Sequence, residues 1–359
     1  MHSPIRSQRD SKVLYNENAY AELSDFLKAN NFSKIFIFVD SNTHEHCLAP
    51  FLQKLETDLE TEVIEIEPGE ENKNIETCME IWKSLSELGA DRKSLFINLG
   101  GGVITDLGGF VAATFKRGIS FINFPTSLLA MVDASVGGKT GVNLDGLKNQ
   151  IGVIHPAEMV VVDTSFLSTL PVAQMRSGLA EMLKHGLIKD EKYWKKLISL
   201  ENLFLDDLEE LIKESIEIKQ AIVEKDPQEE NIRKSLNFGH TFGHAIESYF
   251  LKNDKKPNLL HGEAVAAGMV LESYISQELL SFPPEKLKEI CRYIFSLYGK
   301  VEIDQKDRQE IISFLKYDKK NESGNINFVL LREIGEPVLD CHVSSDLLER
   351  AFQYYIEFQ

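Results

Sequence analysis

The stretch "NLGGGVITDLGGFVAATFKRG", residues 98–118, gives the clearest indication of the fold. A β-rich run leads into three consecutive glycines, and a helix-like segment follows. Because Gly100, Gly101 and Gly102 lack Cβ atoms, backbone N–H groups there can approach a phosphate, and the N-terminus of the following helix adds favourable partial charge. The stretch matches neither GxGxxG nor the GxxxxGK[ST] of a P-loop, so a simple tight turn is the alternative interpretation.

Short apolar runs on both sides of this stretch predict a parallel sheet. They are KIFIFVD (34–40), EVIEIE (62–67), SLFINLGGG (94–102), FINFP (121–125) and MVVVD (159–163), with helix-like segments between them. Strands that are apolar on both faces and alternate with helices belong to a sheet covered on both sides. From residue 175 onward the apolar spacing is mostly three and four, and strands nearly vanish until NFVLL (327–331). We therefore expect an α/β fold, with a Rossmann-like domain over residues 1–165 and an all-helical domain over residues 166–359.

The composition limits the compartment and the partners. With 43% hydrophobic and 26% charged residues and no apolar run of about 20 residues, the chain is typical of a soluble globular protein. The polar beginning lacks the apolar core of a secretory signal, so we expect a cytoplasmic protein. The four cysteines are scattered without CxxC spacing, which indicates neither a disulfide framework nor a zinc–thiolate site. A net charge of −17 argues against nucleic acid, although a local group of Lys and Arg could still bind a small anionic substrate.

Polar residues follow several of the predicted strands. Asp40 ends the first strand, where a carboxylate can accept hydrogen bonds from a ribose. Glu70 and Lys73 follow the second strand, and Thr126 and Ser127 follow "FINFP". Because the carboxyl ends of parallel strands share one edge of the sheet, these residues predict a ligand crevice there.

The next segment, "VDASVGGKTGVNLDGLKNQIG" (132–152), is rich in glycine and polar residues. Its candidate functional residues are Asp133, Lys139, Asn143, Lys148 and Asn149. We expect a loop that folds over nucleotide and substrate and brings two ammonium groups to anionic oxygens. A solvated surface loop is the alternative.

Three histidines and one glutamate supply candidate ligands for a metal ion. In "LNFGHTFGHAIE" (236–247), His240 and His244 share one face of a helix, and His261 opens "HGEAVAAGM". Glu181 lies on the apolar side of another predicted helix, with Lys184 at i+3 on the same face. A buried carboxylate is costly unless it is paired with a cation or a metal. One carboxylate and two imidazoles make the ligand set of a catalytic zinc site, although packing or capping is as common for a histidine pair at this spacing.

The stretch before the histidines adds cationic and polar groups. Lys219, Glu229, Arg233 and Asn237 lie there, and together with Lys139, Lys148 and Lys184 they could form the local basic group that an anionic substrate needs. For any one of them, a surface position is the default interpretation. The histidines without such neighbours, which we interpret as structural or exposed, are His44, His46, His155, His185 and His342.

Taken together, these motifs resemble the 3-dehydroquinate synthase family, in order and over most of the chain. The resemblance rests on "GGGVITDLGGFVAATFKRG", "FPTSLLAMVDASVGGKTGVN", "LKNQIGV", "SGLAEMLKHGLI", "RKSLNFGHTFGHAIE" and "LLHGEAVAAGM". It implies an NAD-binding α/β domain, a helical metal-binding domain, an active site in the cleft between them, and a homodimer. The implied reaction converts 3-deoxy-D-arabino-heptulosonate 7-phosphate to 3-dehydroquinate and phosphate, in the shikimate route to aromatic amino acids.

The resemblance also implies roles for individual residues. The ligands of a Zn²⁺ or Co²⁺ ion fall on Glu181, His240 and His261. The substrate and catalytic positions fall on Asp133, Lys139, Lys184, Lys219, Glu229, Arg233, Asn237 and His244, with Lys319 or Lys320 from "KYDKKN". Arg117 matches an arginine that reaches the substrate phosphate from the partner subunit. The NAD positions fall on Asp40, Glu70, Lys73, Gly101, Gly102, Val103, Asp106, Thr126, Ser127, Lys148 and Asn149.

The chain departs from the family pattern at one place, and alternative functions stay open. Where the family reads DExExGxR, this chain has "DPQEENIR", with Pro227 and Asn231 in place of Glu and Gly. Asn tolerates left-handed backbone geometry, so we expect the turn to survive, with Glu229 the less certain assignment. The alternatives are a glycerol-dehydrogenase-type polyol dehydrogenase, a sister sugar phosphate cyclase and a catalytically silent NAD-binding regulator. The regulator would be expected to lack Glu181, Lys184 or a ligand histidine, and all are present.

Overall fold

The computed structural model describes residues 11–145, 147–199, 205–253, 255–315 and 326–359. The chain divides into two compact units, Met1–Pro171 and Val172–Gln359. This division falls slightly after residue 165 because the short helical turn η5 (Thr164–Thr169) follows a residue tied into the first unit. That residue, Asp163, accepts hydrogen bonds from Tyr20 Oη and Lys54 Nζ, each at 2.8 Å.

The first unit is built on a six-stranded sheet whose neighbouring strands are all parallel. The strand order is β1 (Lys12–Tyr15), β8 (Met159–Val162), β5 (Ser120–Pro125), β4 (Leu95–Gly100), β2 (Ile35–Asp40) and β3 (Thr61–Ile66). The five strands expected from the sequence are confirmed. The edge strand β1 was not predicted, because its four residues "KVLY" are too short to show a periodic pattern.

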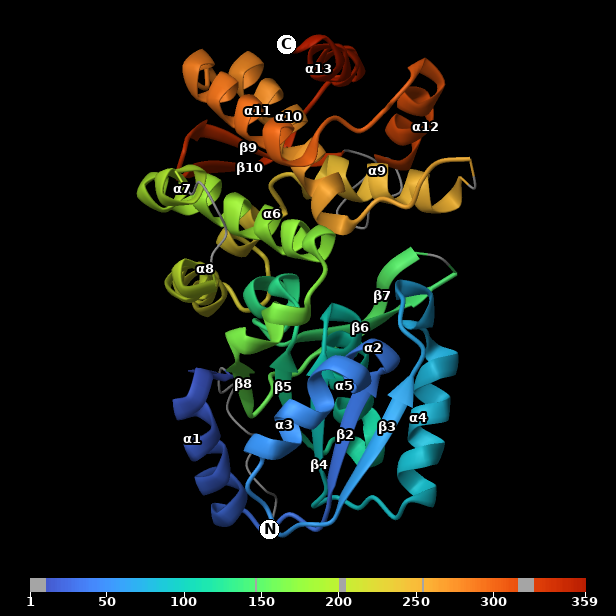
Figure 1. Cartoon of the computed structure of the whole chain (residues 1–359). Coiled ribbons are helices and arrows are strands. Elements are labelled where there is room, and N and C mark those ends of the chain that lie inside the picture. The colour runs from blue at the N-terminus through green and yellow to red at the C-terminus, as the bar shows by residue number, and fades with distance from the viewer. Residues whose placement is uncertain (1–10, 146, 200–204, 254, 316–325) are drawn as a thin grey trace. The chain divides into compact units, whose positions relative to one another are not determined.

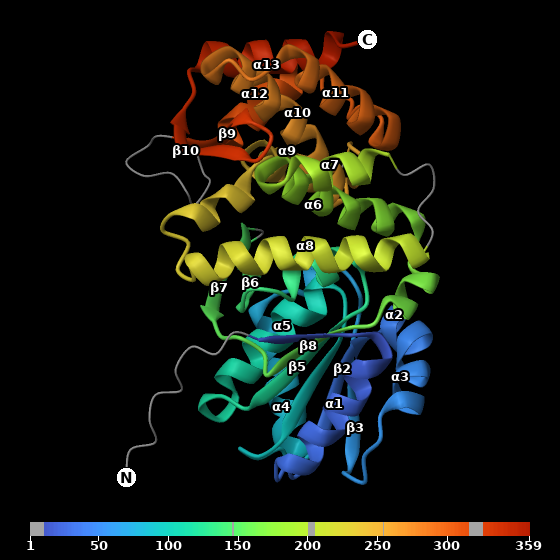
Figure 2. The ribbon, with the colours of Figure 1, turned by 90° about the vertical axis from the view of Figure 1, so that its left-hand side faces the viewer.

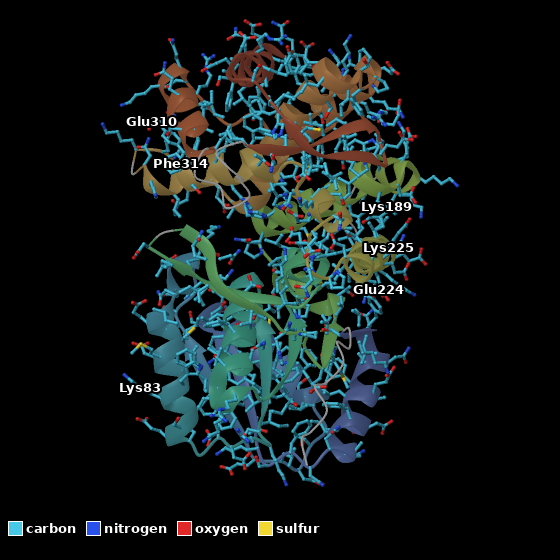
Figure 3. All side chains as sticks on the ribbon, turned by 180° about the vertical axis from the view of Figure 1, so that it is seen from behind. Lys83, Lys189, Glu224, Lys225, Glu310 and Phe314 are labelled. Atoms are coloured by element: carbon cyan, nitrogen blue, oxygen red, sulfur yellow. The ribbon has the colours of Figure 1, made fainter. Side chains whose placement is uncertain are left out.

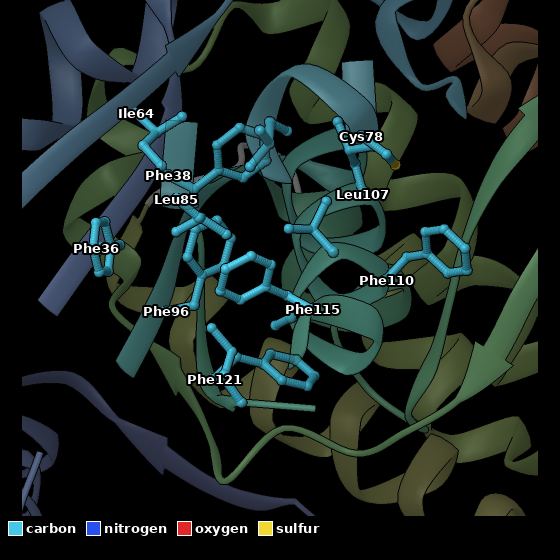
Figure 4. Packing of buried hydrophobic residues seen from close by; sticks show 14 of the residues in the cluster. Phe36, Phe38, Ile64, Cys78, Leu85, Phe96, Leu107, Phe110, Phe115 and Phe121 are labelled. Atoms are coloured by element: carbon cyan, nitrogen blue, oxygen red, sulfur yellow. The ribbon is translucent and has the colours of Figure 1, made fainter. Parts of the chain in front are cut away.

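Helices cover both faces of this sheet (Figure 1). Phe36, Phe38, Phe96 and Phe121 pack on one face with residues of α4 (Ile75–Glu87) and α5 (Gly102–Thr114), as Figure 4 shows. On the other face, Phe124 contacts Phe51 of α3 (Ala49–Lys54), with 4.8 Å between ring centroids, and the ring of Tyr20 of α1 (Asn16–Ala29). Short helical segments complete the unit: α2 (Ser41–Thr43), η1 (His44–Leu48), η2 (Glu70–Asn72), η3 (Phe115–Arg117) and η4 (Ala130–Ala134).

The polar segment after β5 is not the loop that we expected from its sequence. It forms a two-stranded antiparallel sheet of β6 (Lys139–Leu144) and β7 (Leu147–Ile154). Gly141 lies opposite Gly152, and a Cβ on Gly152 would lie 2.3 Å from the Thr140 carbonyl oxygen. The glycines that suggested a flexible loop therefore allow two backbones to approach closely within a hairpin.

The second unit is mostly helical, as expected. Its helices are α6 (Val172–Lys189), α7 (Glu191–Ile198), α8 (Leu205–Lys225), α9 (His240–Lys252), α10 (His261–Leu280), α11 (Pro284–Tyr298), α12 (Gln305–Leu315) and α13 (Ser345–Glu357), with the short turn η6 (Ile232–Asn237). The unit also contains the hairpin of β9 (Asn327–Glu333) and β10 (Glu336–His342), so it is not all-helical. β9 packs against α10, which also contacts α6, α9, α11 and α13 (Figure 2).

Charged side chains of both signs lie on the surface. Charged side chains such as Lys83, Lys189 and Glu224 project outward from their helices (Figure 3). Among the described residues, no helix combines the length and the apolar character needed to cross a membrane.

Candidate functional site

The glycine turn lies at a topological switch point of the parallel sheet. β2 pairs with β3 on one side and with β4 on the other, so the chain reverses its direction across the sheet after β3. In open α/β sheets, ligands bind outside the carboxyl ends of the strands at such a point. Asp40 ends β2, and Gly100, Gly101 and Gly102 lead from β4 into α5, which begins at Gly102.

Two of these glycines are not required by the packing of the protein itself. A Cβ on Gly101 would lie no closer than 3.4 Å to its nearest neighbour, Ser127 Oγ, and a Cβ on Gly102 would lie 3.4 Å from the Ala134 Cβ. Gly101 has φ −74°, which any residue can adopt. By contrast, a Cβ on Gly100 would lie 2.5 Å from Ile104. The tight turn therefore explains Gly100. Close approach of a ligand phosphate to the protein backbone would explain Gly101 and Gly102.

Residues from separate segments join beside this turn. Lys73 Nζ lies 2.5 Å from Asp106 Oδ2 on α5 and 2.7 Å from Asn149 Oδ1 on β7. Asn143 of β6 donates to Glu70 Oε1 at 2.9 Å, and Lys148 Nζ lies 3.9 Å from the same oxygen. Burial raises the pKa of the Asp106 carboxyl, even though Lys73 lies beside it. Six residues predicted from the sequence are thus brought together by the β6–β7 hairpin.

Other predicted residues of the first unit lie near the same strand ends. One carboxylate oxygen of Asp40, Oδ1, accepts from the Thr43 N–H at 2.8 Å and so caps the turn after β2. Thr126 N–H donates to the Gly100 carbonyl at 3.0 Å, and Ser127 Oγ accepts from the Ala130 N–H at 3.3 Å. The remaining predicted residues are Val103 in the first turn of α5, Asp133 in η4 and the exposed Lys139 at the start of β6.

Arg117 occupies a strained turn. Lys116, Arg117 and Gly118 have φ values of 48°, 71° and 103°, so two consecutive non-glycine residues are left-handed. Such backbone costs about 1–3 kcal/mol per residue and persists where the surrounding structure requires it. Arg117 also lines an open surface hollow of about 450 Å³ with Asp91, Arg92 and Lys116. The turn presents a cluster of cationic side chains on the surface of the first unit.

In the second unit, the structure brings the proposed metal ligands together. The Oε1 atom of Glu181 on α6 lies 3.2 Å from His240 Nε2 on α9 and 3.5 Å from His261 Nε2 on α10. One donor atom from each residue lies within 4.8 Å of the other two. Among the described residues, Glu181 Oε1 is buried without a hydrogen-bond donor in suitable geometry. An orphaned carboxylate oxygen that faces two imidazoles fits a divalent metal ion with one oxygen and two nitrogen ligands.

Close backbone contacts fix the three helices that carry these ligands. A Cβ on Gly262 would lie 2.2 Å from the Ser177 carbonyl oxygen, and Gly262 N–H donates to Ser177 Oγ at 2.9 Å. Ser177 lies one helical turn before Glu181 on α6, and Gly262 follows His261 on α10. This contact therefore holds His261 close to Glu181. At the start of α9, the buried carboxylate of Glu272 accepts from Gly239 N–H at 2.6 Å. That bond satisfies a helix N-terminus and fixes the position of His240.

Both ligand histidines have an acceptor behind them. His240 Nδ1 lies 3.2 Å from the Phe238 carbonyl oxygen, and His261 Nδ1 lies 3.3 Å from Glu247 Oε2. An imidazole whose Nδ1–H donates to such an acceptor presents the lone pair of Nε2 to a metal. The ring of His244 lies 5.2 Å from the His240 ring and 5.8 Å from the His261 ring, between centroids.

The charges in this cluster are strongly coupled. Burial alone would raise the pKa of Glu181, but the neighbouring Lys184 and His240 hold it well below its usual range. Lys184 Nζ donates to Glu181 Oε2, and both side chains are almost completely buried. Burial lowers the pKa of His240. Burial would also lower the pKa of His261, but Glu247 and Glu181 raise it to about 10.

The remaining predicted residues of this unit lie on α8, η6 and the turn between them. Lys219 on α8 and Arg233 in η6 are buried, and Arg233 Nη1 donates to the Pro227 carbonyl at 2.9 Å. Asn237 Nδ2 donates to Glu229 Oε1 at 3.1 Å. The expected left-handed residue is not Asn231, whose φ is −136°, but Glu229, whose φ is 61°.

The turn survives the departure from the family pattern for another reason. Asp226 accepts from the backbone N–H groups of Glu230, Asn231 and Arg233, and these bonds hold the segment in shape. The two lysines expected from "KYDKKN", Lys319 and Lys320, lie outside the described residues.

Three residues that organise the site were not predicted as part of it. Glu247 and Glu272 are buried carboxylates, and Asp226 closes the turn. The signal for Glu247 was present in the sequence, because it lies at i+7 from His240 and i+3 from His244 on one face of α9. Glu272 carried no comparable signal, since its partner is the backbone of another helix.

Two family profiles match adjoining parts of the chain. The profile of the "3-dehydroquinate synthase N-terminal" family matches residues 63–177, and that of the "3-dehydroquinate synthase C-terminal" family matches residues 178–321. The chain is 43% identical to a 3-dehydroquinate synthase of Parabacteroides distasonis over 351 residues, which cover 97% of this chain and 98% of the relative.

Solved structures of sugar phosphate cyclases share the fold. A 2-epi-5-epi-valiolone synthase from Streptomyces hygroscopicus, with NAD+ and Zn2+ bound, is 25% identical and superposes with a TM-score of 0.85 over 100% of both chains. A 2-deoxy-scyllo-inosose synthase, complexed with carbaglucose-6-phosphate, NAD+ and Co2+, is 24% identical and has a TM-score of 0.80 over 96% of both chains, a likeness of fold alone.

The matches do not favour a polyol dehydrogenase or a sister cyclase. The two synthase family profiles match consecutive segments, residues 63–177 and 178–321, and the synthase relative covers nearly the full length of the chain. The chain therefore belongs to the 3-dehydroquinate synthase family.

Proposed function

We propose that the Glu181, His240 and His261 cluster holds the divalent metal ion with which this chain carries out the family's reaction. That reaction converts 3-deoxy-D-arabino-heptulosonate 7-phosphate to 3-dehydroquinate and phosphate, and the enzyme is an NAD- and metal-dependent phosphorus–oxygen lyase. The observation that carries this assignment is the orphaned Oε1 atom of Glu181, which faces Nε2 of both histidines at 3.2 and 3.5 Å.

The donor set favours Zn²⁺ or Co²⁺. Two imidazoles and one carboxylate leave coordination positions for substrate, as in catalytic zinc sites. The related valiolone synthase has Zn2+ bound, which supports zinc, and the inosose synthase has Co2+. When bound, such an ion supplies Lewis acidity that makes substrate hydroxyls easier to deprotonate.

NAD would bind at the switch point of the first unit. Gly101 and Gly102, which the packing of the protein itself does not require, suit close approach of the pyrophosphate, and Asp40 at the end of β2 suits a ribose hydroxyl. Glu70, Lys73, Asp106, Lys148 and Asn149 would shape the remaining wall through the hydrogen-bonded group around Lys73. Val103, Thr126 and Ser127 complete the proposed set.

The cationic and polar residues would bind the two anionic groups of the substrate. Lys139, Lys184, Lys219 and Arg233 would neutralise the carboxylate and the phosphate, and Asn237, Asp133 and Glu229 would bind hydroxyls. Lys219, Lys184 and Arg233 are each buried, so charge-assisted hydrogen bonds to them would be strong. His244, beside the two ligand histidines, would accept and return protons at the substrate hydroxyls.

The reaction needs NAD although it produces no net oxidation. Bound NAD would supply a hydride acceptor for C5, and with loss of the C5 hydroxyl proton to a base such as His244 this carbon would become a ketone. The ketone would make the C6 proton acidic, so that this proton and the phosphate could be eliminated. Return of the hydride to C5, ring opening and an intramolecular aldol closure would complete the carbocycle. The protein's part in these later steps is to orient the groups and exclude water.

Arg117 is proposed to act on the phosphate bound by a neighbouring subunit, in a homodimer. The strained turn at residues 116–118 supports a functional constraint on this side chain, because left-handed backbone persists only where it is required. A cytoplasmic location is also proposed, since all four cysteines are free thiols, as expected in a reducing compartment.

Substitution of a ligand tests the metal assignment. His261→Ala should lose both the metal, measured by elemental analysis, and the release of phosphate from the heptulosonate phosphate. Treatment of the unsubstituted protein with a chelator should abolish phosphate release in the same way, and added Zn²⁺ should restore it. Full metal occupancy in His261→Ala would remove this residue from the ligand set.

A further inference from the structure

Glu247 is a buried carboxylate that the ligand set does not include. Its side chain lies on α9 and is only 7% exposed. Its Oε2 atom accepts from His261 Nδ1 at 3.3 Å. Burial of an ionised carboxylate is costly unless it is paired or hydrogen-bonded, so the position of Glu247 against this imidazole calls for a reason.

The two ligand histidines differ in what lies behind them. His240 has the neutral carbonyl of Phe238 at its Nδ1, whereas His261 has a charged carboxylate. A carboxylate acceptor fixes the ring orientation and increases the electron donation from the opposite nitrogen more than a carbonyl does. His261 is also the first residue of α10.

We propose that Glu247 is a positioning residue that holds the His261 ring with Nε2 directed at Glu181 and makes His261 the stronger of the two imidazole ligands. This inference rests on the proposed metal site and deepens it. Because Glu247 and His240 lie on the same helix, α9 provides one ligand directly and orients the other. A displacement of α9 would therefore disturb both imidazoles at once.

Two substitutions separate the charge of Glu247 from its hydrogen bond. Glu247→Gln keeps the size and an acceptor oxygen but removes the charge, and we expect the dissociation constant for Zn²⁺ to rise about tenfold. Glu247→Ala removes both properties, and we expect a rise of about a hundredfold. The constants are measured on the full-length, metal-depleted protein by competition with a chromophoric chelator, without substrate or turnover.

A matched control on the same helix accounts for general destabilisation. Tyr249 is buried on α9, where its hydroxyl donates to Asp307 Oδ1 at 2.6 Å and accepts from Asn253 Nδ2 at 3.0 Å. Tyr249→Phe removes a buried hydrogen bond from α9 and should change the Zn²⁺ dissociation constant by less than about twofold. The visible d–d absorption of the Co²⁺ form should shift in Glu247→Gln and stay unchanged in Tyr249→Phe, because it reports the ligand field rather than folding stability.

The results distinguish this inference from the proposed function. If the unsubstituted protein binds no divalent ion, the metal site fails and the role of Glu247 fails with it. If the unsubstituted protein binds one ion, and Glu247→Gln binds it equally tightly with an unchanged Co²⁺ spectrum, the metal site stands and the positioning role is wrong. Weaker binding in the order Gln then Ala, with a shifted spectrum, supports the inference.

Discussion

The backbone of Gly268 on α10 packs directly on Gly239, so that a Cβ on Gly268 would lie 1.9 Å from the Gly239 carbonyl oxygen. Gly239 is the residue before α9, which begins with the proposed ligand His240, and α10 begins with the proposed ligand His261. The contact between two glycines thus sets the distance between the helices that carry both imidazoles.

Substitution of Gly268 by Ala should separate α9 from α10. Overpacking of this kind costs about 1–3 kcal/mol, and we expect a lower melting temperature together with weaker Zn²⁺ binding. Calorimetry of the metal-free protein and chelator competition measure the two effects. Gln277→Ala, at a half-exposed position of the same helix, is the control and should change neither quantity appreciably. Unchanged metal affinity in Gly268→Ala would show that the contact does not set the site.

Substitution of Gly101 by Ala should affect NAD binding but not folding. The added Cβ meets nothing closer than 3.4 Å, so the free energy of unfolding should change by less than about 0.5 kcal/mol. The same Cβ would occupy the space proposed for the pyrophosphate, so the dissociation constant for NADH should rise at least about tenfold. Gly100→Ala, whose Cβ would lie 2.5 Å from Ile104, should instead lower the stability. Normal NADH binding by Gly101→Ala would favour the simple tight turn.

The carboxylate of Asp226 should make the stability of the fold depend on pH in the acidic range. Burial alone would raise the pKa of Asp226, but hydrogen bonds from the Asn231, Arg233 and Glu230 backbone lower it below its usual value. The folded pKa is thus below the unfolded value of about 3.9, so the carboxylate stabilises the fold above that pH. This stabilisation is lost as the pH falls through the folded pKa.

The corresponding variant is Asp226→Asn. Its melting temperature should be lower than that of the unsubstituted protein at pH 7, and the difference should shrink below about pH 4. Circular dichroism between pH 7 and pH 3 measures both. Asp58→Asn, at an exposed position, serves as the control and should show little difference at either pH. A difference for Asp226→Asn that stays constant down to pH 3 would contradict the role assigned to the charge.

Arg117 should complete the phosphate site of another subunit. Arg117→Ala and Lys184→Ala subunits should each be inactive alone, and a mixture of the two should recover part of the activity, because a mixed dimer can assemble one intact site. Phosphate release after mixing is the measurement, with subunit exchange checked by differently tagged chains. If the subunits exchange and no activity returns, Arg117 does not act across a subunit interface.

The sequence predicted the elements with strong periodicity and the residues with chemical motifs. Runs such as "KIFIFVD" are apolar on both faces. The five runs predicted as strands are consecutive neighbours, β8, β5, β4, β2 and β3, in one parallel sheet. The Glu181, His240 and His261 cluster could be predicted because its signals lie within short stretches of sequence. These signals are the helical spacing of the histidines and a carboxylate on the apolar face of a helix.

Features that depend on contacts between distant segments were not predicted. Glycines and polar residues dominate the β6–β7 segment, and this composition predicts a loop; only the strand pairing shows that Gly141 and Gly152 permit close backbone approach. The acceptor role of Glu247 requires the packing of α9 beside α10. In the 226–233 turn, the preference of Asn for left-handed geometry predicts Asn231, but the left-handed residue is Glu229. The hydrogen bond from the Asn231 N–H to Asp226 outweighs that preference.

The fate of the C5 hydrogen shows whether NAD is used and regenerated in every turnover. The protein is given 3-deoxy-D-arabino-heptulosonate 7-phosphate carrying deuterium at C5, with NAD at one equivalent per active site. Phosphate release and absorbance at 340 nm are followed together, and the product is analysed by mass spectrometry and NMR. We expect many equivalents of phosphate, less than one equivalent of NADH, and deuterium retained at the corresponding carbon of 3-dehydroquinate. Stoichiometric NADH, or deuterium lost to the free cofactor, would contradict the synthase mechanism and indicate a dehydrogenase.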